Sequence, residues 1–245
     1  MSTVPTDTPL APTPAACEQA LDWHVGDMPY SVAFDDHFYC RTDGRLECGH
    51  VFLAGNSLPA RWQAGGDFAI GELGFGTGLN LCETWRQWTL TPKIAGASLS
   101  FTSFELYPMR RADIARALSA WPEIADQRTA LLTHWPDAPV GRVGLDLAED
   151  VRLTVVCGPA LETLAATDME MDAWFLDGFA PSRNPDMWSE ALMAEVYRHT
   201  RPGGSFATYA AAGFVRRNLQ AAGFTVSRSP GFAGKREMLS GVRPA

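Results

Sequence analysis

The sequence has 245 residues, 46% of them hydrophobic and 20% charged, as expected for one globular domain with a small extension. No apolar run approaches the roughly 20 residues of a membrane helix, and the first residues lack the basic and apolar parts of a secretory signal, so we expect a cytoplasmic protein without membrane contacts. The formal net charge of −8 argues against a nucleic-acid partner for the chain as a whole.

The N-terminal quarter predicts a disordered tail followed by a small β extension. Residues 1–16 are rich in Pro, Thr and Ala and offer little to bury, which is typical of disorder. Residues 17–66 contain two strand-like segments, SVAFDDHFYC and HVFLAG, separated by the turn signal Thr-Asp-Gly at 42–44. We therefore assign 17–66 to an N-terminal β extension and 67–245 to the main domain.

From residue 67, short apolar runs alternate with helical stretches, which indicates βαβ units and a mainly parallel sheet. The fold class is therefore α/β. We expect a hairpin and a closing antiparallel pair near the C-terminus, and an irregular segment between two of the helices. The expected strands are 68–73, 99–106, 140–148, 151–158, 172–179, 204–210 and two within 224–242. The expected helices run from the glycines to about 88, over about 109–120, from Asn184 to about 200 and over 211–222. The irregular segment is 121–138.

The segment FAIGELGFGTGLN places three glycines, Gly74, Gly76 and Gly78, between a buried strand and a helix. Glycine there permits positive φ and a close approach of a ligand to the backbone, and the helix N-terminus supplies free N–H groups. A dinucleotide fingerprint would need a small residue at position 79, where Leu stands. The alternative spacing, E-x-G-x-G-x-G, places Glu72 beside the loop, which suits the cationic amino-acid end of S-adenosylmethionine (SAM). A purely structural turn is the competing interpretation.

A second carboxylate, Glu105, ends the next predicted strand, where the ribose hydroxyls of SAM require an acceptor. No acid ends the following strand, which reads CGPA at 157–160, so the residue that contacts adenine stays unassigned. Including two polar residues of the loop and helix start, the predicted cofactor-binding set is Glu72, Gly74, Gly76, Thr77, Gly78, Asn80 and Glu105.

The strand in DAWFLDGFAP ends at Asp177, and ligands of open α/β sheets lie at the carboxyl ends of the strands. A carboxylate at this place can accept a hydrogen bond from an amine, orient the amine lone pair and take up its proton. Phe179 is suited to stack on a flat base, and Pro181 stiffens the loop. The structural alternative is that Asp177 only caps its own loop.

Two other features need an interpretation. His37, Cys40, Cys48 and His50 form the pattern H-x2-C-x7-C-x-H, but this gap matches no common zinc knuckle and we predict no metal site. The cysteines number five and form no CxxC pair, which favours free thiols in a reducing compartment.

The C-terminal quarter is basic although the chain is acidic. Residues 181–245 hold nine Lys and Arg against four Asp and Glu. Arg216, Arg217, Lys235 and Arg236 lie in this part and form either a phosphate-binding face or ordinary helix-surface charges.

Several segments together resemble the methyltransferase domain family of MnmC, whose stand-alone form is MnmD. They are GELGFGTGLN, SFELYP, DAWFLDGFAPSRNPDMWS, RPGGSFATYAAAGFVRRNLQAAGF and GKREML, and the resemblance spans roughly residues 30–240. It implies a Rossmann-like sheet with helices on both faces. It also implies SAM-dependent N-methylation of 5-aminomethyl-2-thiouridine at the tRNA wobble position, giving 5-methylaminomethyl-2-thiouridine.

By the same resemblance, the cofactor-binding set above holds SAM, Asp177 faces the amine, and Phe179 and Pro181 face the uracil. From charge alone, we expect the four basic residues to contact phosphates or the anticodon loop. MnmC also carries an FAD-dependent oxidase domain that exposes the amine. Because this sequence ends at Ala245, we expect it to need no FAD and to act after a separate oxidase.

Two alternative functions remain open. The first is a SAM-dependent methyltransferase for another amine or small molecule, which the acidic bulk of the chain favours. Steep salt dependence of tRNA binding would separate it from the tRNA enzyme. The second is a non-catalytic nucleotide-binding or scaffold protein, and the acids at three predicted strand ends argue against it. A SAM titration tests that alternative directly.

Overall fold

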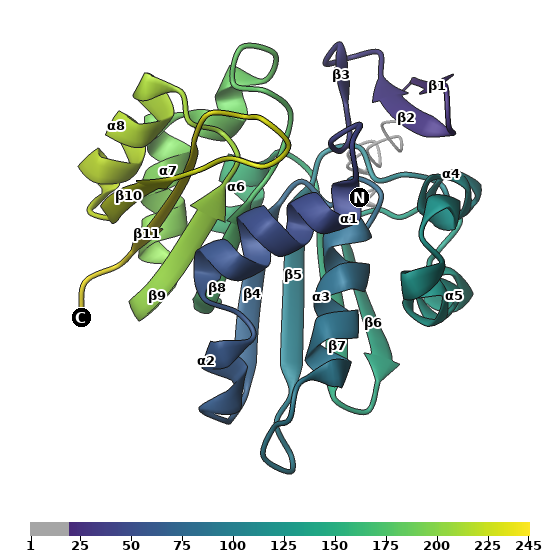
Figure 1. Ribbon diagram of the computed structural model, residues 1–245, viewed down its shortest axis with the longest axis horizontal. Helices are drawn as coiled ribbons and strands as arrows, with labels where there is room; N and C mark the ends of the chain where they lie inside the picture. Colours follow the sequence, from purple (N-terminus) through teal and green to yellow (C-terminus); the bar gives the residue numbers. More distant parts are fainter. Residues whose placement is uncertain (1–19) are drawn as a thin grey trace, which may run out of the picture.

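The computed structural model describes residues 20–245, so the predicted disordered tail lies outside the described residues. An eight-stranded sheet of order β10-β11-β9-β8-β4-β5-β7-β6 forms its centre (Figure 1). This arrangement confirms the α/β prediction. The strands are β4 (Phe68–Leu73), β5 (Leu99–Glu105), β6 (Arg142–Ala148), β7 (Val151–Cys157), β8 (Met171–Leu176), β9 (Thr200–Thr208), β10 (Thr225–Ser229) and β11 (Met238–Val242).

The sheet is parallel at its centre and antiparallel at both edges. β4 pairs in parallel with β5 on one side and with β8 on the other, and β7 and β9 extend the parallel part. The predicted hairpin (β6–β7) and closing pair (β10–β11) are antiparallel, as expected. Because the strand order reverses between β4 and β8, a crevice opens at their carboxyl ends, the usual ligand position in such sheets.

Helices cover both faces of the sheet (Figure 1). Along β8, Ala173 and Phe175 pack into one core while Trp174 and Leu176 pack into the other, because successive strand residues point to opposite faces. The first core takes the π-helical turn η1 (Cys48–Leu53), α2 (Ala60–Gln63), α3 (Leu79–Leu90), α4 (Arg111–Ala117) and α5 (Ala125–His134), and the second takes α6 (Ala160–Ala165), α7 (Glu190–Arg198) and α8 (Gly213–Ala222). The short helix α1 (Gly44–Glu47) precedes η1 and contacts α3.

Short 3-10 turns connect several of these helices. They are η2 (Ala54–Asn56), η3 (Leu118–Ala120), η4 (Pro122–Ile124) and η5 (Pro185–Trp188). Within residues 20–245, every helix is too short or too polar to cross a lipid bilayer.

The N-terminal extension is only partly β structure. A three-stranded antiparallel sheet consists of β1 (Leu21–His24), β2 (Met28–Ser31) and β3 (Asp36–His37). The expected strand in HVFLAG is wrong, because the chain from Gly44 to Asn56 is helical. The Asp43 side chain caps this helical segment by accepting the N–H of Leu46. A short apolar run such as HVFLAG fits a buried helix as well as a strand, so the hydrophobic pattern alone does not distinguish the two.

Two other expectations also need correction. Residues 121–138 are not irregular, since Pro122 opens a 3-10 turn and α5 follows directly. Asn184 makes no side-chain capping bond; a 3-10 turn follows it, and α7 begins only after Ser189, whose hydroxyl accepts the N–H of Leu192. In both places a proline marks the start of a short turn that precedes the α-helix.

The packing of β4 against β8 yields a stability prediction. A Cβ added at Gly71 would lie 2.6 Å from the ring of the fully buried Trp174, whereas one added at Gly144, on edge strand β6, would meet nothing within 4 Å. We expect Gly71→Ala to cost about 1–3 kcal/mol of unfolding free energy through overpacking. Thermal melts should show Gly144→Ala close to the native protein, and equal melting temperatures for the two variants would contradict this packing.

Candidate active site

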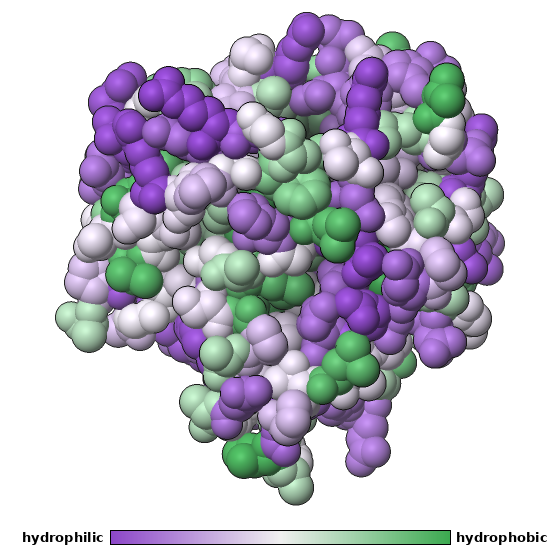
Figure 2. Space-filling model, viewed as in Figure 1, coloured by the Kyte–Doolittle hydropathy of each residue, from purple (hydrophilic) through white to green (hydrophobic). Residues whose placement is uncertain are grey.

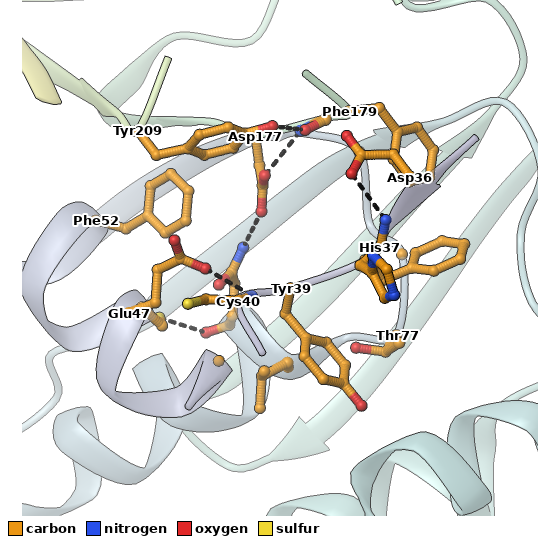
Figure 3. A pocket seen from close by; sticks show the side chains of 18 of the residues that line it. Asp36, His37, Tyr39, Cys40, Glu47, Phe52, Thr77, Asp177, Phe179 and Tyr209 are labelled. Carbon is orange, nitrogen blue, oxygen red and sulfur yellow. Dashed lines mark hydrogen bonds between the residues drawn. The ribbon is translucent and has the colours of Figure 1, made fainter. Parts of the chain in front are cut away.

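A pocket of about 380 Å³ lies at the carboxyl ends of the parallel strands (Figure 3). Its size falls within the roughly 300–1,000 Å³ of small-molecule sites. Four parts of the chain form it: residues 36–41, which are β3 and the residues after it, the helical segment from 44 to 52, the glycine loop with the start of α3, and the loop after β8. Glu105, Tyr209 and Lys235 complete the lining.

The glycine loop has the backbone conformation that its sequence predicts. Gly74, Gly76 and Gly78 have φ values of 84°, 52° and 76°, which L side chains rarely adopt. Gly74 and Gly76 line the pocket, and so does Thr77. Gly78 does not; a Cβ there would lie 2.9 Å from the Phe75 ring, so this glycine serves the packing of the turn.

Asn80, in the first turn of α3, connects two carboxyl groups. Its Nδ2 donates to Glu72 Oε1 at 3.0 Å and to Asp177 Oδ2 at 2.8 Å. Asn80 and Asp177 line the pocket, whereas Glu72 is fully buried behind them. Burial raises the pKa of Glu72 well above its usual range. Glu72 therefore acts on the pocket through Asn80.

Glu105 ends β5 and is held by the backbone of the glycine loop. Its Oε2 accepts the N–H of Gly76 at 2.9 Å, and its Oε1 accepts the N–H of Tyr107 at 2.7 Å. Burial raises its pKa, and these N–H groups oppose that rise. The backbone N–H groups of Phe75 and Leu106 also lower this pKa, so the loop backbone stabilises the charged form of Glu105. Glu105 lines the pocket, and its carboxylate is an acceptor that suits the hydroxyl groups of a ribose, as the sequence predicts for SAM.

Asp177 lies on the pocket wall in the loop after β8. Its Oδ1 accepts the N–H of Gly178 at 2.8 Å, so it also caps its own loop, as the structural alternative expected. Burial raises its pKa to about 7, the charge of Glu47 adds to the rise, and Lys235 opposes it. A carboxyl group with this pKa is well matched to accept a proton near neutral pH.

Phe179 lines the pocket within an aromatic cluster. It stacks on Phe34, with ring centroids 4.6 Å apart, and meets the edge of Phe38 at 5.1 Å. Trp188 Nε1 donates to the Phe179 carbonyl at 3.1 Å and fixes this loop. Pro181 lies two residues further on and does not line the pocket.

Of the four predicted basic residues, one lines the pocket. Lys235 lines the pocket, and its Nζ donates to Glu47 Oε1 at 2.7 Å. Arg216 and Arg217, on α8, and Arg236 lie outside the pocket lining. Hydrophilic side chains gather at the upper left of Figure 2, over α8 and the connection between β10 and β11.

The structure adds pocket residues that the sequence analysis missed. Asp36 Oδ2 accepts the N–H of Ala180 at 2.9 Å and ties the N-terminal segment to the loop after β8. The Tyr209 hydroxyl donates to the Gly178 carbonyl, and the Glu47 carboxylate accepts the N–H of Cys40 at 2.9 Å. Tyr209 follows β9 directly, so the strand-end argument used for Asp177 would have found it.

The residues of the His-Cys pattern have separate partners. His37 contacts His24, Cys48 donates to the Asn80 carbonyl, and His50 contacts the Pro230 carbonyl. Across residues 20–245, no group of three or more His, Cys, Asp and Glu side chains is placed to hold a metal ion.

Residues 122–244 match a family model described as S-adenosyl-L-methionine-dependent methyltransferase. This match covers half of the chain and includes Asp177 and Lys235. The chain belongs to the SAM-dependent methyltransferases. SAM is the cofactor of this family, which agrees with the loop glycines and with the carboxylate of Glu105 on the pocket wall.

Curated relatives of this methyltransferase carry the name tRNA 5-methylaminomethyl-2-thiouridine biosynthesis bifunctional protein MnmC. The relative from Chromohalobacter salexigens is 46% identical over 240 residues, and the one from Pseudomonas aeruginosa is 48% identical over 226 residues. These alignments cover 95% and 91% of this chain, but 34% of each relative. The chain thus spans about a third of the length of the curated relatives it matches.

Among solved structures, the methyltransferase resembles that of MNMC2 from Aquifex aeolicus. The TM-score is 0.73, with 20% sequence identity, over 93% of this chain and 71% of the other. At this identity the likeness concerns the fold, and it confirms the Rossmann-like prediction.

The raised pKa of Asp177 predicts a pH-dependent effect on stability. The folded protein binds this proton up to about pH 7, and an unfolded chain only to about 3.9, so stability falls as the pH rises between these values. Asp177→Asn removes this cost. We expect its melting temperature to exceed that of the native protein by a few degrees at pH 8 and by less at pH 5.

The exposed Asp186 provides the matched control. Asp186→Asn should show the same small difference at both pH values. If the effect of Asp177→Asn were also independent of pH, the carboxyl group would titrate as an ordinary exposed acid, and the prediction would fail.

Proposed function

We propose that this protein uses SAM to N-methylate the aminomethyl group of 5-aminomethyl-2-thiouridine at the tRNA wobble position, giving 5-methylaminomethyl-2-thiouridine. The observation that carries the proposal is Asp177, a carboxylate with a pKa of about 7 on the wall of a pocket that the glycine loop also lines. The relatives' names supply the substrate. The sequence identity of 46–48% over nearly the whole chain supports the transfer of that name to this site.

When bound, SAM supplies a methyl group activated by its sulfonium. Gly74, Gly76 and Thr77 would hold it along the loop backbone, Asn80 and Glu105 through side-chain bonds, and Glu72 through Asn80. Gly78 contributes by setting the turn. We thus propose that all of the predicted cofactor-binding residues serve SAM. Glu72 and Gly78 do so without lining the pocket themselves.

Asp177 would perform the proton chemistry. Its carboxylate accepts a hydrogen bond from the substrate amine and turns the nitrogen lone pair toward the methyl group. Methyl transfer from bound SAM to this nitrogen would leave the nitrogen with a positive charge and a surplus proton. The surplus proton on nitrogen passes to Asp177 and from there to solvent. Phe179 would contact the uracil, while Pro181 shapes the loop that carries Phe179.

The polynucleotide would extend from the pocket over the basic C-terminal part. We propose that Arg216, Arg217 and Arg236 contact phosphates of the anticodon loop, and that Lys235 acts at the pocket mouth. The substrate amine must be exposed by an earlier reaction, which we assign to an FAD-dependent oxidase acting upstream. With tRNA as its substrate, the protein would act in the cytoplasm.

The direct test is methyl transfer from labelled SAM to tRNA that carries 5-aminomethyl-2-thiouridine, followed by nucleoside mass spectrometry. We expect one new nucleoside, 5-methylaminomethyl-2-thiouridine. Asp177→Asn should lower the rate at least about 100-fold, the usual contribution of a general base. Asp186→Asn should retain native activity, since its side chain is exposed and outside the pocket lining.

Two outcomes would contradict the proposal in different ways. Methylation of small-molecule amines but of no tRNA would assign the pocket to another substrate. Tight SAM binding with native activity in Asp177→Asn would remove Asp177 from the reaction while leaving the cofactor site in place.

A further inference from the structure

The ammonium group of Lys235 lies between a carboxylate and an aromatic ring at the pocket. Its Nζ is 2.7 Å from Glu47 Oε1 and 4.6 Å from the centroid of the Tyr209 ring. A carboxylate beside an aromatic face is the combination that recognises organic ammonium ions, through a charge-assisted hydrogen bond and a cation–π contact. In the free protein, a side chain of the chain itself makes these contacts.

The carboxylate of Glu47 is held in place without Lys235. Its Oε2 accepts the N–H of Cys40 at 2.9 Å, and only 9% of its side chain is exposed. A buried carboxylate that loses its cation is strongly disfavoured. A positive charge is therefore needed beside Glu47. Because the N–H of Cys40 also holds the Glu47 carboxylate, a cation other than Lys235 could supply this charge.

The Tyr209 ring is held in place as well. Its hydroxyl donates to the carbonyl of Gly178, the residue after Asp177. The ring that lies under the ammonium group is thus attached to the loop that carries the proposed base. Figure 3 shows Glu47, Tyr209 and Asp177 around the same cavity.

The Lys235 side chain, by contrast, is free to move away from Glu47 and Tyr209. Its side chain is 43% exposed, and it comes from the connection between β10 and β11. That connection has a second attachment to the helical segment, because His50 Nε2 lies 2.9 Å from the Pro230 carbonyl. Lys235 can therefore swing into solvent while the connection stays attached.

We propose that Glu47 and Tyr209 form a binding site for a primary ammonium group, which Lys235 fills in the free protein and which the ligand's ammonium group takes over. Two ligands of the proposed reaction carry such a group: the aminomethyl nucleoside and the amino-acid end of SAM. The nucleoside would bind as the ammonium ion and would release one proton before its nitrogen could accept the methyl group, because an ammonium ion has no lone pair. The inference rests on the proposed function only where the ammonium group is that of the aminomethyl nucleoside. Released from Glu47, Lys235 would stand at the pocket mouth, available to a phosphate.

The exchange would preserve the charge around Asp177. Burial raises the pKa of Asp177, Glu47 raises it further and Lys235 lowers it, so both charges act on that carboxyl group. One ammonium group replacing another leaves this balance in place. The proposed base therefore keeps its proton affinity when the ligand enters.

The test compares ligands that differ only in the amine. One pair is tRNA with an aminomethyl or a hydroxymethyl group on the wobble uridine. The other is S-adenosylhomocysteine and its desamino analogue. The ratio of the two Kd values in each pair gives the preference for the ammonium form. Because both tRNAs make the same phosphate contacts, these contacts do not affect the ratio. The variants are Glu47→Gln and Lys235→Met, with Arg236→Met, the exposed neighbour of Lys235, as control.

We expect the native protein to prefer the ammonium form roughly tenfold or more in at least one pair. Glu47→Gln should reduce this preference to near unity, and Lys235→Met should increase it because the competing ammonium group is gone. Arg236→Met should leave the ratio unchanged even if both tRNAs bind more weakly. If Glu47→Gln loses the ammonium preference in the tRNA pair, the site binds the substrate amine. If it loses the preference in the cofactor pair, the site binds the amino group of SAM.

A folded Glu47→Gln variant, verified by its thermal melt, that keeps the native preference in both pairs would overturn the ammonium site. An unchanged preference in Lys235→Met would show that Lys235 does not fill the place of the ligand. If the native protein methylates no tRNA, the proposed function fails, and the cofactor pair alone then decides the ammonium site.

Discussion

The Asn80 side-chain amide joins two carboxyl groups, of Glu72 and Asp177, at the carboxyl ends of neighbouring parallel strands. These two hydrogen bonds depend on the sheet order, because β4 and β8 are neighbours and Glu72 pairs with Phe175, two residues before Asp177. It also depends on the glycines, whose positive φ angles start α3 where Asn80 can reach both acids. The loop, the helix start and the proposed base are thus one unit.

The N-terminal segment turns this strand-end unit into a pocket. Helical packing against the sheet brings Glu47 and Cys48 to the lining, and Asp36 fastens the segment to the loop after β8 through the N–H of Ala180. The resulting enclosure withdraws Asp177 from water, which is the main cause of its raised pKa. The same enclosure makes the carboxylates costly, so the site gives up some folding stability for a base that works near neutral pH.

Much of the sheet and part of the site follow from local patterns. Glu105 and Asp177 were predicted because strand ends in a parallel sheet meet at one edge, and Gly74 and Gly76 because the loop requires positive φ. Glu47 was missed because the apolar run after it fits a strand as well as a helix, and only packing decides between them. The charge pattern could not place Arg216 or Arg217 relative to the pocket, since the orientation of α8 is set by the burial of Val215 and Leu219.

In the proposed reaction, Asp177 takes the amine proton and Asn80 adjusts the proton affinity of Asp177. Asn80→Ala removes a hydrogen bond that lowers the pKa of Asp177, so this pKa should rise above about 7. The decisive measurement is the pH profile of kcat/KM for methyl transfer to aminomethyl tRNA in the native protein and in Asn80→Ala. We expect kcat/KM to rise with pH near 7 in the native protein and to show the same rise at higher pH in the variant. A rise at the same pH in both proteins, or none in either, would contradict it.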